Sequence, residues 1–140
     1  MSENCYDVTI IGGGPAGLAA AISVSSEGRK TVLIDSRDSL GGQASASSAI
    51  ENYPGFPDGI TGAELITRFI RQAERFGTEF LRPVVVAGIK AEGNDRVVIT
   101  DDGTRIVSSA VILALGLSYR RLQAKGVANF LGRGISYGMP

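Results

Sequence analysis

The chain has 140 residues, with 14 Lys and Arg against 14 Asp and Glu, and it contains no histidine. This length suits one domain with a core of its own and is too short for two. The zero net charge argues against a nucleic-acid binder, and the missing histidines remove the commonest general base and metal ligand.

No stretch approaches the roughly 20 apolar residues of a membrane span, and the N-terminus lacks a signal-peptide pattern, so we expect a cytoplasmic protein. The single cysteine, Cys5, allows no internal disulfide and precedes the first expected strand.

The first part of the chain predicts a βαβ unit. Residues 7–11 form a β-branched apolar run typical of a strand buried on both faces. The glycines at 12–14 end that strand, and the small residues over 16–27 favour a helix that packs closely on a sheet. Residues 31–34 predict the next buried strand, which ends at Asp35, and the whole fits the length of a βαβ unit.

The middle of the chain predicts a long loop followed by an amphipathic helix. Residues 36–60 read as a loop, and a loop of this length in a small domain is usually functional. Thr61 followed by Glu64 is a capping box, and the apolar positions after it lie on one face of a helix over 61–76.

The second half of the chain predicts mostly strands. Residues 79–86 are expected to form one strand, and turn signals then divide residues 86–108 into a three-stranded antiparallel meander. Residues 110–114 predict a further buried parallel strand closed by Gly116, while the tail over 117–140 has no clear periodicity. The expected fold class is therefore α/β.

The glycine turn carries the first functional signal. Gly12, Gly14 and Gly17 fit the dinucleotide fingerprint, in which the glycines permit the tight turn, the approach of a pyrophosphate and close helix packing. Asp35 ends the next strand, where an acid can accept hydrogen bonds from the ribose hydroxyls. The alternative is an ordinary turn with Asp35 as a loop acid. Asp35 also disfavours NADP at this site, because its charge repels a 2′-phosphate.

Further runs give the chain a resemblance to a known family. Residues 12–17, Gly41-Gly42-Gln43, the run 48–56 (SAIENYPGF) and the run 132–137 (GRGISY) resemble the FAD domain of the thioredoxin reductase family of flavoproteins. The resemblance implies a Rossmann-like FAD-binding domain of the ββα type over residues 1–116, with a parallel sheet and the antiparallel meander. Residues 117–140 would then be a linker toward a nicotinamide-binding domain that this chain does not contain.

The resemblance also implies which residues bind the cofactor. The pyrophosphate of FAD would contact Gly14, Pro15 and Ala16, and its adenosine would contact Asp35, Ser36 and the Val86 backbone at the adenine. Its ribityl and isoalloxazine end would contact Gln43 and Asn52. The remaining contacts would come from Ala114 and Gly116 along the length of FAD and from Gly12, Gly17 and Gly42 in the glycine turns. Without the resemblance, Gln43 and Asn52 would be interpreted as loop-capping residues. Leu115 stands where the family has a threonine, so a hydroxyl contact is lost there.

One departure limits the functional inference. Thioredoxin reductases carry a Cys-x-x-Cys pair directly after the position of Tyr137, and here residues 138–140 are Gly-Met-Pro. The resemblance therefore implies an FAD-dependent oxidoreductase without that dithiol, with no catalytic residue to assign. It would pass electrons from NAD(P)H, bound by a domain outside this chain, through FAD to an acceptor such as a small redox protein.

Two alternatives remain at this point. One is a non-catalytic dinucleotide-binding module or an inactive fragment, and the other is a nicotinamide dehydrogenase without flavin. Residues 41–43 and Asn52 speak against the dehydrogenase, which gives no reason for them. We expect a homodimer, and also self-association of the isolated chain, because a sheet without the family's last strand exposes an edge.

Overall fold

The chain is built on a six-stranded mixed sheet with helices on one side. The structure is a computed structural model and describes residues 4–118 and 120–137. The elements in chain order are β1 (Asn4–Ile11), α1 (Pro15–Ser26), β2 (Thr31–Ile34), η1 (Gly42–Ala46), α2 (Gly62–Arg75), β3 (Glu79–Leu81), β4 (Val86–Glu92), β5 (Asp95–Thr100), β6 (Arg105–Leu113) and α3 (Val127–Phe130). The strand order is β3-β2-β1-β6-β5-β4, with the first four strands parallel and the last three antiparallel.

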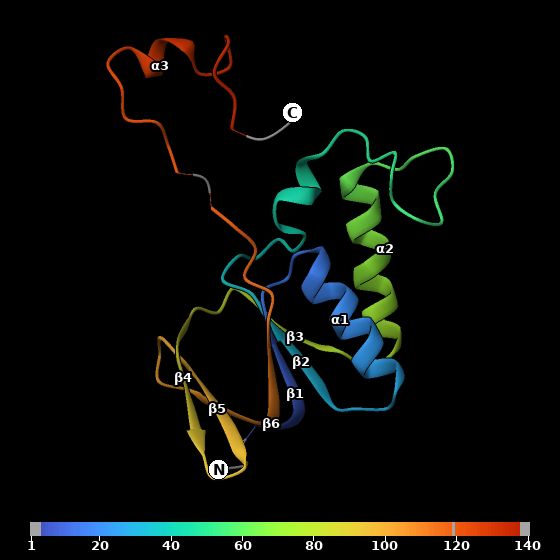
Figure 1. Cartoon of the computed structure of the whole chain (residues 1–140). Coiled ribbons are helices and arrows are strands. Elements are labelled where there is room, and N and C mark those ends of the chain that lie inside the picture. Colours follow the sequence, from blue (N-terminus) through green and yellow to red (C-terminus); the bar gives the residue numbers. More distant parts are fainter. Residues whose placement is uncertain (1–3, 119, 138–140) are drawn as a thin grey trace.

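Two apolar clusters cover the two faces of the parallel strands. The cluster on the helix side consists of Ile10, Leu18, Ala21, Leu33, Leu40, Ile66 and Ala73. The cluster on the meander side consists of Ile11, Val32, Ile34, Val98 and Ile106. Helices α1 and α2 and the β4–β5 hairpin therefore lie on opposite sides of the parallel strands (Figure 1). This layering of meander, sheet and helices confirms the predicted Rossmann-like fold of the ββα type.

Strand β6 corrects one sequence prediction. The meander strand expected to end at residue 108 and the parallel strand expected over 110–114 are a single element. Its residues 105–108 pair antiparallel with β5, and residues 106–113 pair parallel with β1. The strand continues because no turn residue separates its halves. Where the two halves meet, the Ser108 hydroxyl donates to the Ala110 carbonyl at 3.0 Å.

Two other strand boundaries also differ from the prediction. The strand expected over 79–86 ends at Leu81, and Pro83, which has no N–H to donate to a ladder, lies in the break before β4. Strand β1 begins at Asn4, before the predicted residue 7. Cys5 therefore lies within β1, where it is an exposed free thiol.

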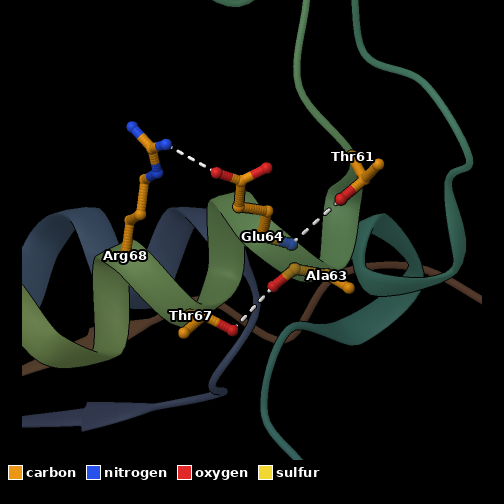
Figure 2. A network of polar contacts seen from close by, with 5 residues as sticks. All are labelled: Thr61, Ala63, Glu64, Thr67 and Arg68. Atoms are coloured by element: carbon orange, nitrogen blue, oxygen red, sulfur yellow. Dashed lines mark hydrogen bonds and ion pairs between the residues drawn. The ribbon is translucent and has the colours of Figure 1, made fainter.

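Helix α2 forms as its capping residues predict. The Thr61 hydroxyl accepts a hydrogen bond from the Glu64 N–H at 3.2 Å, and the Glu64 carboxylate pairs with Arg68 at 2.5 Å instead of reaching back to Thr61 (Figure 2). At the same end, the Gly62 N–H donates to the Ser47 carbonyl at 2.9 Å. A Cβ on Gly62 would lie 1.8 Å from the Ala44 carbonyl oxygen, so α2 and η1 pack in close contact.

The segment after β6 leaves the sheet. Its described part includes the short helix α3, which lies apart from α1 and α2 (Figure 1), and a bridge between Leu131 and Ile135. The Leu122 N–H donates to the Tyr137 hydroxyl at 2.6 Å. Among the described residues, no helix is both long and apolar enough to cross a membrane.

Candidate functional site

A cavity of about 770 Å³ opens where the parallel strands β1, β2 and β6 end. Its walls are the glycine turn after β1, the residues after β2, the start of η1, the start of β4 and the exit from β6. In open parallel sheets, ligands bind at this carboxyl-end edge of the strands, and the volume suits a small molecule or cofactor. The cavity is therefore the candidate functional site of the described chain.

The glycine turn has the geometry that the fingerprint requires. Gly12 has φ of 108°, and a Cβ there would lie 2.2 Å from the Ala114 carbonyl oxygen. A Cβ on Gly17 would lie 1.8 Å from the Gly12 carbonyl oxygen, so α1 packs directly on the turn. A Cβ on Gly14 would meet nothing within 4 Å, so the backbone at Gly14 lies open to the cavity.

The N-terminus of α1 makes this part of the cavity favourable for an anion. Pro15 is the first residue of α1, and the first helical hydrogen bond runs from the Leu18 N–H to the Gly14 carbonyl. The N–H groups of the first turn are therefore not used within the helix, and that turn carries no acidic residue to neutralise the helix dipole. A phosphate group is the usual ligand of such a terminus.

Asp35 holds the glycine turn in addition to facing the cavity. Its Oδ2 accepts from the Gly13 N–H at 2.6 Å, and its Oδ1 accepts from the Arg37 N–H at 2.8 Å. Its backbone carbonyl accepts from the Val84 N–H at 2.9 Å. Each carboxylate oxygen has a further lone pair, so Asp35 can still accept hydrogen bonds from a ligand. The sequence predicts the ligand-facing acid but not its contact with Gly13.

Segment η1 is tied to both sides of the cavity. The Gly41 N–H donates to the Gly13 carbonyl at 2.7 Å, which joins the start of η1 to the glycine turn. The Gln43 side-chain amide donates to the Leu117 carbonyl at 2.8 Å, which joins η1 to the segment after β6. The two hydrogen bonds hold the η1 side of the cavity in place.

The structure gathers most of the predicted site residues around this one cavity. It is lined by the predicted residues Gly12, Gly14, Pro15, Asp35, Ser36, Gly42, Gln43, Val86, Ala114 and Gly116. Ala16 and Gly17 lie within α1 and do not line it, and Asn52 lies in the exposed loop between η1 and α2, also outside the lining.

Sequence reasoning singled out Leu115 but missed the apolar wall to which it belongs. The lining also includes the apolar residues Val84, Val85, Ile89, Leu113, Leu115 and Leu117. Leu113, Leu115 and Leu117 are 59%, 69% and 65% exposed, although they are large apolar side chains. The signal that could have found these three leucines is a leucine at every second position from the last residue of β6 onward. The cavity therefore combines free backbone donors at the start of α1 with a large apolar surface.

Comparison with known proteins agrees with this geometry. The family described as Pyridine nucleotide-disulphide oxidoreductase matches residues 6–138. The chain is 42% identical to a bifunctional thioredoxin reductase/thioredoxin of Mycobacterium leprae over 96% of its own length and 29% of that protein. It is 40% identical to a thioredoxin reductase of Aquifex aeolicus over 96% of its own length and 41% of that protein.

A solved structure shows the same fold. A thioredoxin reductase from Streptococcus pyogenes superposes with a TM-score of 0.81 and 35% identity, covering 98% of this chain and 44% of that chain. The chain thus spans less than half the length of these relatives. Its sequence, its layered fold and its cavity agree, and the chain belongs to the pyridine nucleotide-disulphide oxidoreductase family.

Proposed function

We propose that the cavity binds FAD and that the chain is the FAD-binding part of an oxidoreductase. The observation that carries this proposal is the single cavity in which the open backbone at Gly14, the carboxylate of Asp35 and the apolar wall occur together. FAD has matching parts, because its pyrophosphate is anionic, its ribose carries hydroxyls and its flavin ring is large and flat.

The residues present fit each part of FAD. The pyrophosphate would lie against Gly14 and Pro15 at the N-terminus of α1, where a Cβ would otherwise occupy the open space. Asp35 would accept hydrogen bonds from the adenosine ribose beside Ser36, and the backbone at Val86 would lie against the adenine. The flavin end would lie toward Gln43 and the leucines of the apolar wall that follow β6, Leu115 and Leu117.

When bound, the flavin supplies the redox chemistry, and the chain binds and orients it. The steps that the chain itself performs are binding steps. The N–H groups at the start of α1 stabilise the phosphates, Asp35 fixes the ribose, and Leu115 and Leu117 exclude water from one side of the cavity. We assign no proton-transfer residue.

The whole protein's activity is part of the same proposal. Electrons would pass from NAD(P)H through FAD to a small redox protein, in a homodimer, with residues 117–140 leading to the nicotinamide-binding domain. The similarity to thioredoxin reductases more than twice as long supports this arrangement. Gly138 stands at the first cysteine position of the family's Cys-x-x-Cys, which supports an acceptor reached without that dithiol.

Reconstitution of the 140-residue chain tests the proposal. The chain, mixed with excess FAD and desalted, is expected to stay yellow and to release FAD on denaturation. NADP⁺ is expected to bind more weakly than FAD, because the Asp35 carboxylate repels a 2′-phosphate. NADPH added without oxygen should leave the bound flavin oxidised. A colourless chain that retains ADP-ribose but not FAD would contradict the flavin assignment.

Asp35→Ala gives the sharper test. Loss of a buried hydrogen bond to the ribose is expected to weaken FAD binding by about 1–3 kcal/mol. Asp38→Ala is the matched control, because Asp38 is an exposed acid in the same loop and does not line the cavity. Titration of both variants by flavin fluorescence should separate them, and equal affinities would remove Asp35 from the site.

A further inference from the structure

The exposed side of helix α2 carries a second cavity, separate from the one at the ends of the parallel strands. It is shallow, with a volume of about 290 Å³, and none of its lining residues belongs to the larger cavity. Its lining residues are Arg68, Arg71, Gln72 and Arg75. Residues three and four apart lie on one side of a helix, so these side chains gather there. Three of them are positively charged, and all four end in N–H donors.

Two of the arginines are held in place by their neighbours. The Arg68 guanidinium pairs with the Glu64 carboxylate at 2.5 Å, as Figure 2 shows, and its central carbon lies 5.2 Å from the centre of the Phe56 ring. The central carbon of the Arg75 guanidinium lies 4.7 Å from the centre of the Phe76 ring. These cation–π contacts restrict both side chains, so less conformational freedom would be lost when a ligand binds to them.

The two residues between these arginines have unused donors. Arg71 and Gln72 are exposed, and neither side chain makes a hydrogen bond or an ion pair to another described residue. Arg75 likewise forms no salt bridge within the described part of the chain, although Glu74 precedes it in the sequence. Arg71 and Arg75 are four residues apart, a spacing at which like charges destabilise a helix. An anion bound between them would remove this repulsion and accept hydrogen bonds from the free donors.

We propose that this second cavity binds the phosphate group of a small soluble compound that carries at least two negative charges. The planar fork of a guanidinium donates two parallel hydrogen bonds to the oxygens of one phosphate group. Glu64 and Glu74, on the same helix, confine the positive charge to the cavity. An extended acidic protein surface would meet these two carboxylates, whereas a compact phosphate contacts the arginines and Gln72. The proposal does not rest on the FAD site, because the two cavities share no residue.

An NMR titration of the 140-residue chain with inorganic pyrophosphate tests this site. The ionic strength is held constant, because salt screens exposed charges. Saturable shifts are expected for the side-chain Nε–H signals of Arg71 and Arg75. Pyrophosphate bound at the start of α1 would instead shift the backbone signals around Gly14, so the result for each cavity is obtained separately.

Arg71→Gln and Arg29→Gln form a matched pair of variants. Both remove one positive charge, but Arg29 is an exposed residue before β2 that lines neither cavity. Arg71→Gln is expected to raise the pyrophosphate dissociation constant of this cavity at least roughly ten-fold, because a charge-assisted hydrogen-bonding group is lost. Arg29→Gln is expected to leave it unchanged. Circular dichroism shows whether Arg71→Gln folds, and Arg75→Gln replaces it if it does not.

Three results would overturn the proposal. The first is the absence of saturable shifts at the two arginines. The second is an equal loss of affinity in Arg71→Gln and Arg29→Gln, because the net charge of the chain would then be responsible. The third is binding of a polyglutamate peptide without binding of pyrophosphate, which would make this side of α2 a surface for an acidic protein.

Discussion

Gly14 and Gly17 lie three residues apart in one turn and face opposite spatial constraints. A methyl group on Gly14 would enter open space in the cavity, whereas one on Gly17 would lie 1.8 Å from a backbone oxygen. Gly14 has φ of −76°, which alanine adopts without strain. The space beside Gly14 is therefore available to the proposed ligand, whereas the missing side chain of Gly17 allows α1 to pack on the turn.

This difference predicts opposite outcomes for two alanine substitutions. Gly14→Ala should leave the free energy of unfolding within about 1 kcal/mol of the wild type and weaken FAD binding at least roughly ten-fold. Gly17→Ala should destabilise the chain by roughly 2 kcal/mol or more, because the clash is with backbone. Urea unfolding and FAD titration measure both quantities. A stable Gly14→Ala variant with unchanged FAD affinity would contradict the role of Gly14.

At this scale the sequence predicts roles better than contacts. The glycine spacing predicts at which positions a side chain would not fit, because this requirement arises between residues that are close in the sequence. The bond from Gly13 to Asp35 depends on two strands lying side by side, and no local pattern contains it. Leu113 and Leu117 were missed for the same reason, because the cavity that they line exists only after folding.

Helix α2 contains a matched pair of threonine hydroxyls (Figure 2). The Thr61 hydroxyl accepts from the Glu64 N–H, which otherwise has no partner within the helix. The Thr67 hydroxyl donates to the Ala63 carbonyl at 2.8 Å, and that carbonyl already has the helical ladder as a partner. Only the first contact satisfies an otherwise unpaired group.

Thr61→Ala should therefore lower the free energy of unfolding by about 1 kcal/mol, the usual effect of removing an N-cap. Thr67→Ala is the control and should be neutral or slightly stabilising, because alanine is the better helix former. Urea unfolding of both variants measures the difference. Equal losses would show that the cap contributes nothing specific.

Element boundaries were predictable where the signal is local. The predicted helix over 61–76 differs from α2 by one residue at each end, because caps and stops are encoded next to the helix. The prediction divided β6 into two strands because the continuity of a strand depends on its partners. Strand β6 pairs with both β5 and β1 as far as Ser108, and with β1 as far as Leu113. The break before β4 could have been predicted from Pro83.

A tyrosine contact joins distant strands and makes the stability of the whole molecule depend on pH. The Tyr6 hydroxyl donates to the Glu79 carboxylate at 2.6 Å, which links β1 to β3 across β2. Burial, and then the hydrogen bond to Glu79 and its negative charge, raise the pKa of Tyr6 from 10.0 to about 12. A raised pKa stabilises the fold while tyrosine is protonated, so this contribution is complete below pH 10 and lost as the pH rises toward about 12.

Tyr6→Phe should remove this pH dependence. The variant is expected to be slightly less stable than the wild type at neutral pH, and its free energy of unfolding should fall less steeply above pH 10. The effect should be small, since the hydrogen bond is exposed to solvent. Urea unfolding at a series of alkaline pH values tests it, and parallel curves for the two proteins would rule out the linkage.

The architecture of the molecule was more predictable than its strand boundaries. The βαβ start, the capped helix and the meander are each local patterns, and together they leave few ways to bury two sheet faces, which is why the ββα layering was predicted correctly. The continuation of β6 along β1 beyond its pairing with β5 follows from a register that no sequence pattern specifies.

The pairing of β1 with β6 sets the order in which the molecule can fold during synthesis. Val8 lies opposite Ala110, so β1 must wait for a partner strand that is synthesised much later. The β4–β5 hairpin closes between neighbouring residues and can form early, whereas the centre of the sheet is a slow, non-local contact. The cavity lies between the ends of those two late partners. A nascent chain therefore lacks this cavity until β1 and β6 have paired, and the proposed cofactor could bind only after that step.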